Sequence, residues 1–258
     1  MARKWPAFPY ADKAYAYDAT ALKKQWPRLH RGDCEPLPKE ASVLDAWRAF
    51  HAGEFAKAVD GGVAAGGAGI NAAIKAQVVH AFYVEQNAKN KMALYEEAAR
   101  WADERRSAEP KDPNAQYLYA FALGRYGQTL SVAKALAQGL GGKVKDALLA
   151  AMKLEPKHAD ANIAYGAYQA EVIDKVGALV GGATYGAKKT SAIEHFERAE
   201  KLNPESAIAR IEHANALIMM FGKSRLDEAT RLYEAAAECR PADAMERLDV
   251  ERAKAELE

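Results

Sequence analysis

One short phrase recurs along the chain: an amphipathic helical stretch ends, one residue follows, and then comes a proline. Proline lacks a backbone N–H and its ring clashes with the preceding turn of a helix, so each copy marks a helix end. The phrase therefore predicts helices that end at repeated intervals, which is typical of a helical repeat protein. The copies are Ala108-Glu109-Pro110, Leu154-Glu155-Pro156, Leu202-Asn203-Pro204 and, more loosely, Cys239-Arg240-Pro241.

An aromatic ring between two alanines recurs at fixed offsets before the later prolines. Small residues let one helix lie close against the next, and the ring fills the gap between their turns. The two clearest copies are Ala192, Phe196 and Ala199 before Pro204, and Ala229, Tyr233 and Ala236 before Pro241. At these positions the sequence resembles the second helix of the tetratricopeptide repeat (TPR). The positions that correspond to the first helix of this repeat hold Asn162, Tyr165, Gly166 and Gln169 in one repeat and Arg210, His213, Ala214 and Leu217 in the next.

The resemblance implies an all-α fold, a TPR-like right-handed superhelix of antiparallel helix pairs. Composition agrees, because alanine is frequent and no segment sustains the alternation of β-branched and aromatic residues that strands prefer. We expect the solenoid to span residues 41–258, with a charged helix at Ala242–Leu257 as a C-terminal cap with a polar outer face. Residues 1–40 hold many aromatics and five of the ten prolines, and we expect them to form an N-terminal arm that lies on the solenoid.

The repeats differ from the TPR family in length. Their prolines lie 46, 48 and 37 residues apart, whereas the family repeat has about 34 residues. The two long repeats therefore carry insertions, which fall after the first helix at residues 131–142 and 172–186. Each insertion reads as a helical extension followed by a glycine-rich turn, and we expect the two inserted helices to pack on each other.

Residues 144–204 resemble a narrower family as well. They combine a long insertion before Ala183-Thr184-Tyr185 with the run Phe196-Glu197-Arg198-Ala199-Glu200-Lys201-Leu202-Asn203-Pro204. This segment is similar to the TPR-like regulator of microtubule dynamics family, which also carries a long insertion before an Ala-Thr-Tyr turn. Most of the matching residues pack helices together, so the resemblance implies an architecture and no catalytic motif.

Charge and cysteine content restrict the classes of partner. Lys and Arg number 36 and Asp and Glu number 35, so a net charge of +1 gives no general attraction to nucleic acid or to anionic lipid. Two lone cysteines, Cys34 and Cys239, fit a reducing compartment. We expect a cytoplasmic protein with no membrane span, because no apolar run approaches about 18 residues and prolines interrupt the N-terminus.

Motifs for catalysis and cofactors find no support in their sequence context. Gly67-Ala68-Gly69-Ile70-Asn71-Ala72 fits a dinucleotide fingerprint in letters, but an alanine-rich helix and no strand precedes it. Histidines are scattered, and no H-E-x-x-H, C-x-x-C or G-x-S-x-G occurs. The sequence therefore predicts neither an enzyme nor a cofactor or metal site.

First helices line the concave face of such a solenoid, so their inward positions are the candidate contacts. We place Leu118, Ala122, Arg125 and Tyr126 inward in one repeat, Ile163, Ala167 and Glu171 in the next, and Ile211, Asn215 and Met219 in the third. Arg125 and Glu171 are expected either to pair across adjacent helices and orient a polar ligand, or to pair for structure alone.

Two functions fit these features. In the first, the protein is a non-catalytic scaffold that binds a peptide or a partner protein in the concave groove through Arg125, Tyr126, Glu171, Asn215 and Met219. In the second, it carries a small molecule in a pocket that the inserted helices close, beside Lys134 and Lys175. A homodimer through the inserted helices is compatible with both. A groove filled by residues 1–40 would instead indicate autoinhibition or a purely structural role.

Overall fold

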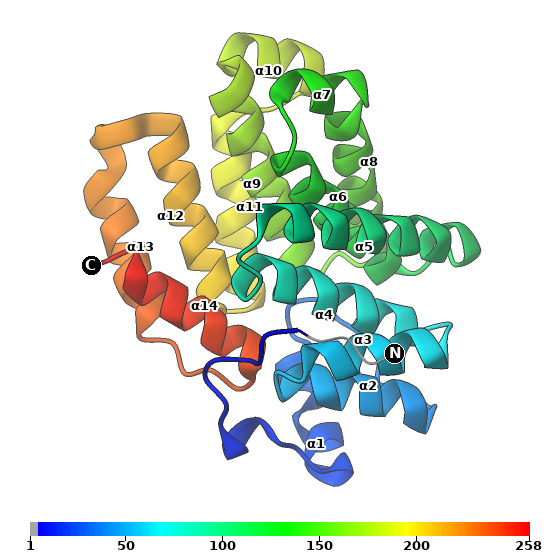
Figure 1. Ribbon diagram of the computed structural model, residues 1–258. Helices are drawn as coiled ribbons and strands as arrows, with labels where there is room; N and C mark the ends of the chain where they lie inside the picture. Colours follow the sequence, from blue (N-terminus) through cyan, green and yellow to red (C-terminus); the bar gives the residue numbers. More distant parts are fainter. Residues whose placement is uncertain (1–4) are drawn as a thin grey trace.

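The computed structural model describes residues 5–258, so residues 1–4 of the expected arm lie outside the described residues. Within that range the chain is helical and contains no strand (Figure 1). The helices in chain order are α1 (Ala19–Leu29), α2 (Ala41–His51), α3 (Phe55–Ala65), α4 (Gly69–Tyr83), α5 (Ala88–Ala108), α6 (Pro113–Gln128), α7 (Val132–Ala137), α8 (Leu140–Leu154), α9 (Ala159–Val176), α10 (Ala178–Tyr185), α11 (Lys189–Leu202), α12 (Ala207–Phe221), α13 (Leu226–Ala237) and α14 (Ala244–Ala255).

The helices stack as successive antiparallel pairs, α2 with α3, α4 with α5, α6 with α8, α9 with α11 and α12 with α13 (Figure 1). The predicted all-α, TPR-like solenoid is thereby confirmed. Three helices end two residues before a proline of the recurring phrase, at Ala108, Leu154 and Leu202. The following first helices begin where Asp112, His158 or Ser206 accepts backbone N–H groups with its side chain, which satisfies otherwise unpaired donors of the first turn.

The pattern of rings and small residues packs neighbouring helices together. Phe196 is fully buried between α9 and α12, where it stacks on His213 with ring centroids 5.1 Å apart. On its other side lies Gly166, where an added Cβ would come within 2.8 Å of the Phe196 ring. Only a glycine leaves room for the aromatic ring at that point, which explains the pairing of the two residue types in the sequence.

Both insertions form short separate helices. The first is α7, which lies over the start of α8, and the second is α10, which lies beside the end of α9. Tyr185 of α10 reaches across to α8, since its carbonyl accepts a hydrogen bond from Lys145 Nζ at 2.8 Å and its ring lies beside Gly141. The two inserted helices are therefore linked through α8, at one end of the molecule (Figure 1).

The last helix, α14, returns to the first part of the chain. It packs on α12 and α13 and also contacts α2 (Figure 1). Arg28 of α1 forms two hydrogen bonds with Glu246, at 2.6 and 2.9 Å, and His51 Nδ1 lies 2.7 Å from Asp243. Helix α14 therefore packs on the final hairpin and also connects the two ends of the solenoid. One face of α14 is buried around Leu248.

The N-terminal segment is part of the same core. Phe8, Tyr15 and Trp26 are buried in a cluster that includes Trp47 and Phe50 of α2. Burial of these three rings accounts for part of the aromatic content of the first 40 residues, whereas Tyr10 is exposed. Within residues 5–258, no helix has the length and apolar character required to cross a membrane.

Candidate functional site

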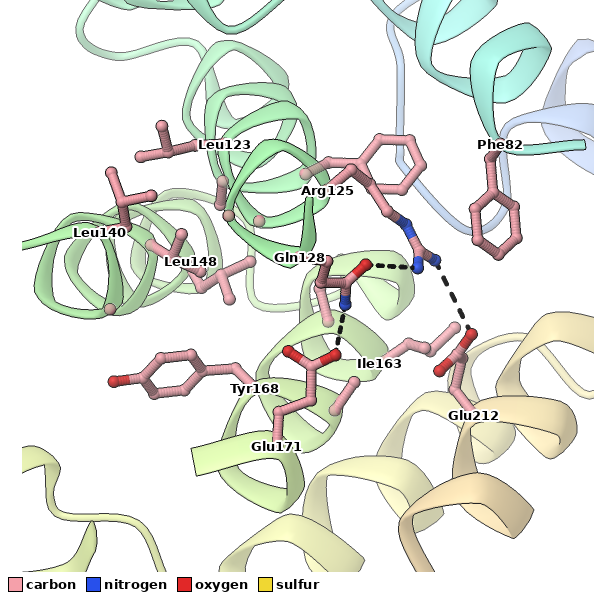
Figure 2. Close-up of a pocket in the computed structure, with 18 of the residues that line it drawn as sticks. Phe82, Leu123, Arg125, Gln128, Leu140, Leu148, Ile163, Tyr168, Glu171 and Glu212 are labelled. Carbon is pink, nitrogen blue, oxygen red and sulfur yellow. Dashed lines mark hydrogen bonds and ion pairs between the residues drawn. The ribbon is translucent and has the colours of Figure 1, made fainter. Parts of the chain in front are cut away.

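The inner surface of the solenoid encloses a cavity of about 530 Å³ (Figure 2). Its walls come from the first helices α4, α6, α9 and α12, from α8, from both inserted helices, and from α14. This volume lies within the range of pockets that bind small ligands or anchoring side chains. The cavity is therefore the candidate functional site.

One part of the cavity is apolar. It lies where α6, α7, α8 and α9 meet, and the inserted helix α7 covers it with half-exposed apolar side chains. Figure 2 shows Leu123, Leu140 and Leu148 pointing into this part from α6 and α8. The apolar lining consists of Leu123, Leu130, Val132, Ala135, Leu136, Leu140, Val144, Leu148, Val172 and Val176.

A strip of polar side chains crosses the other part. Arg125 Nη1 donates a 3.0 Å hydrogen bond to Gln128, whose amide in turn donates to the carboxylate of Glu171 (Figure 2). Arg125 Nη2 lies 3.8 Å from Glu212, and its guanidinium covers the Phe82 ring at 3.9 Å. Arg125 and Glu171 therefore do not form the expected direct pair, because Gln128 stands between them.

Helix α14 contributes a further carboxylate to the cavity wall. Asp249 is buried, and the Tyr83 hydroxyl donates a hydrogen bond to it. Burial, reinforced by the nearby carboxylates of Glu246 and Asp243, raises the pKa of Asp249 to about 8. Arg252 one turn further on pairs with Glu212 at 3.0 Å and not with Asp249.

We expect Asp249→Asn to change how stability depends on pH. The pKa of Asp249 is about 8 in the folded protein, against an ordinary value of 3.8, so between these values the folded state holds a proton that the unfolded state has lost. This contribution to stability is complete below pH 3.8 and disappears as pH rises toward 8. As pH rises through that window, the free energy of unfolding of the variant should increase relative to that of the wild type by about 1.4 kcal/mol per pH unit. Urea unfolding at pH 5, 6 and 7 measures this difference, and parallel curves would contradict it.

The chain's own loop after α1 occupies the end of the inner surface opposite the inserted helices. The Gly32 carbonyl accepts a 3.0 Å hydrogen bond from the Asp160 N–H, and a Cβ on Gly32 would meet the Asp160 carboxylate at 2.2 Å. Asp33 pairs with Lys75 of α4 at 2.6 Å and with His30 at 2.9 Å, and all three side chains are buried. Residues 30–35 thus fill this end of the groove.

The buried charges at this end are fixed by their surroundings. Burial alone would raise the pKa of Asp33, but Lys75 and His30 hold it well below its usual range. Burial lowers the pKa of His30 to about 4, so its imidazole is neutral at pH 7. Glu35, whose pKa burial raises, accepts hydrogen bonds from the amides of Asn71 and Asn114. Each group is paired within the chain, which indicates a structural role for the loop.

Comparison with known families agrees with this architecture. Residues 75–258, more than half of the chain, match the family described as regulator of microtubule dynamics protein 1-3. The chain belongs to this family. The resemblance predicted from residues 144–204 is confirmed, and the match extends from α4 to the C-terminus, so it includes most of the helices that wall the cavity.

A solved structure has the same type of helical fold. This family member is similar to TTC0263, a thermophilic TPR protein of Thermus thermophilus, with a TM-score of 0.58 and 15% sequence identity over 83% of this chain and 97% of that chain. At this identity the similarity concerns the fold. No curated protein matches the sequence.

The cavity is lined by most of the residues that were predicted from the sequence to bind a partner or a ligand. They are Arg125, Glu171, Lys175, Asn215 and Met219. Two others lie elsewhere: Tyr126 packs against the core beside the cavity, and Lys134 is exposed on α7. In α9 the expected inward positions Ile163 and Ala167 line the cavity as well.

The inward register of α6 and α12 was wrong in part. Leu118, Ala122 and Ile211, which were expected to face the groove, are buried in the cores between helices. The positions that line the cavity instead include Gln128, one turn beyond Arg125, and Glu212, one turn before Asn215. A spacing of three or four residues from the predicted positions could have identified both. No comparable signal links Tyr83 and Asp249, which α4 and α14 bring together from distant parts of the chain.

Proposed function

We propose that this protein is a non-catalytic scaffold that binds a short segment of a partner protein in the cavity on its inner surface. The observation that carries the proposal is the combination of an apolar recess with a polar strip on the concave side of a TPR-like solenoid. Such a surface suits a peptide, because an apolar side chain fills the recess while polar groups fix the backbone.

The N-terminal loop supports a short segment over a long one. Because residues 30–35 fill one end of the inner surface, an extended chain cannot run along its whole length. We propose that residues 1–40 act as an arm that closes this end, and that residues 41–258 form the solenoid around the binding site. The partner then enters on the side of the inserted helices and of α12.

One observation favours the second candidate, a small-molecule carrier. The inserted helices α7 and α10 contribute Val132, Leu136 and Tyr185 to the wall, so the insertions partly enclose the cavity. Lys175 also lines it, as the carrier hypothesis required, whereas Lys134 does not. A metabolite that raises the melting temperature of the purified protein, while no protein partner contacts the cavity, would support the carrier and contradict the scaffold.

Site-specific photo-crosslinking tests the scaffold directly. A benzophenone amino acid at Met219, which lines the cavity and is 42% exposed, should crosslink one partner in stoichiometric amounts. The matched control is the same amino acid at Leu154, which is 40% exposed but lies outside the cavity and should crosslink that partner weakly. Equal labelling from both positions would show that the partner binds another surface.

The family's description gives one partner to test first. Cosedimentation with microtubules, using the wild type and Arg125→Ala, would show whether this family member binds them through the cavity. We place this interaction in the cytoplasm, where the free thiols Cys34 and Cys239 would remain reduced.

A further inference from the structure

The charges that line the cavity are unevenly paired. Each cation has a carboxylate close by: Arg125 and Arg252 share Glu212, at 3.8 and 3.0 Å, and Lys175 lies 3.2 Å from Asp174. Lys75 is paired with both Asp33, at 2.6 Å, and Asp160, at 3.7 Å. The cations of the cavity are therefore satisfied within the chain.

Two carboxylates differ from this pattern. Among residues 5–258, neither Glu171 nor Asp249 has a cationic partner within 4.0 Å. Asp249 is fully enclosed and accepts a hydrogen bond from the Tyr83 hydroxyl. Glu171 lies at the edge of the apolar recess, and its hydrogen-bond partner is the neutral amide of Gln128 (Figure 2). A carboxylate in this setting lacks the counter-charge that partly buried carboxylates normally have.

Burial raises the pKa of Glu171, and Arg125 and the hydrogen bond from Gln128 only partly oppose this effect, to which Glu212 adds. A positive group placed beside Glu171 would therefore be stabilised by a carboxylate that the protein leaves without an ion pair. A negative group there would face Glu171 and Glu212 with no unpaired cation to receive it.

We infer that the cavity selects a partner segment in which a lysine or arginine neighbours a large apolar residue, with Glu171 pairing the positive charge and the recess between α6 and α8 taking the apolar side chain. This inference rests on the proposed scaffold function and adds the chemistry of the occupant. The geometry supports it, because Glu171 is next to Val172 on α9, and Val172 belongs to the apolar lining of the recess.

A phage-displayed library of random heptapeptides, selected against the immobilised full chain, tests the inference. We expect enriched peptides to carry lysine or arginine beside a large apolar residue. Binding of the synthesised peptides should weaken about tenfold in Glu171→Gln, the loss of one charge-assisted contact. The matched control is Glu197→Gln on the exposed face of α11, outside the cavity, and it should bind as the wild type does.

The outcomes separate the two proposals. Enriched peptides that are acidic or neutral, or that bind Glu171→Gln as tightly as the wild type, would overturn the inference while leaving the scaffold in place. A selection that enriches no peptide over background would contradict the scaffold and the inference together. Salt dependence gives a second readout independent of the variant: binding of a basic peptide to the wild type should weaken as ionic strength rises, and binding insensitive to salt would count against a charge contact.

Discussion

Replacing Asp33 by alanine is expected to destabilise the protein by about 3–5 kcal/mol, because it leaves the buried Lys75 without its nearer counter-ion, with only Asp160 remaining at 3.7 Å. Asp33 accepts from Lys75 at 2.6 Å, pairs with His30 at 2.9 Å, and receives the Glu35 N–H at 3.2 Å. The side chain of Lys75 is only 5% exposed, so water cannot replace the lost carboxylate. Chemical denaturation followed by circular dichroism measures the change in the free energy of unfolding.

Two further variants distinguish a buried charge from a general effect of losing an aspartate. Asp45→Ala removes a 2.9 Å ion pair with Arg48, but both side chains are largely exposed, so the expected loss is at most about 1 kcal/mol. Adding Lys75→Met to Asp33→Ala should restore part of the stability, since it removes the buried lysine charge, and only part because Asp160 then loses its cationic partner. Equal losses in Asp33→Ala and Asp45→Ala would show that the network around Lys75 contributes little.

Leu217→Ala is expected to cost about 2–5 kcal/mol through the cavity that it leaves between α12 and α13. Leu217 is fully buried in a cluster with Ile211, Ala229 and Tyr233, so the substitution removes packing contacts from the core of this hairpin. The loss should appear first in the last hairpin and in α14, which packs on it. Hydrogen exchange of α12 to α14, together with denaturant unfolding, measures both the size and the place of the effect.

The same substitution at an exposed site provides the control. Leu179 on the inserted helix α10 is 86% exposed, and Leu179→Ala is expected to change stability by less than about 0.5 kcal/mol. If the two leucine variants lose similar stability, then the TPR-like register that places Leu217 in the core is incorrect.

The sequence predicted the repeat because the determinants of that repeat are local. A proline ends a helix wherever it stands, and an alanine–ring–alanine pattern packs a neighbouring helix whatever the rest of the chain does. The buried ring of Phe196 and the facing Gly166 therefore agree with the expectation from the sequence. That two repeats carry an additional helix also followed from proline spacing, since that spacing counts residues directly.

The candidate site could be predicted in part. Glu171, Asn215 and Arg125 were identified because a repeat register assigns inward positions along a straight helix. Gln128 and Glu212 were missed because the faces of α6 and α12 are rotated by about one position from the register assumed, which also placed Leu118 and Ile211 in the core. A helix face can be rotated this way without changing the apolar pattern, so the pattern alone does not fix it.

By itself, the sequence determined the fold class, the helix ends ahead of Pro110, Pro156 and Pro204, and the residues that pack one hairpin on the next, because these depend on contacts between residues close in the chain. Only the tertiary structure decided that α14 returns to the N-terminal helices, that the loop around Asp33 fills one end of the inner surface, and that Gln128 separates Arg125 from Glu171. The physical reason is that these contacts join segments far apart in the chain. Buried charges and hydrogen bonds fix their geometry, and no local periodicity encodes which distant partner each will meet.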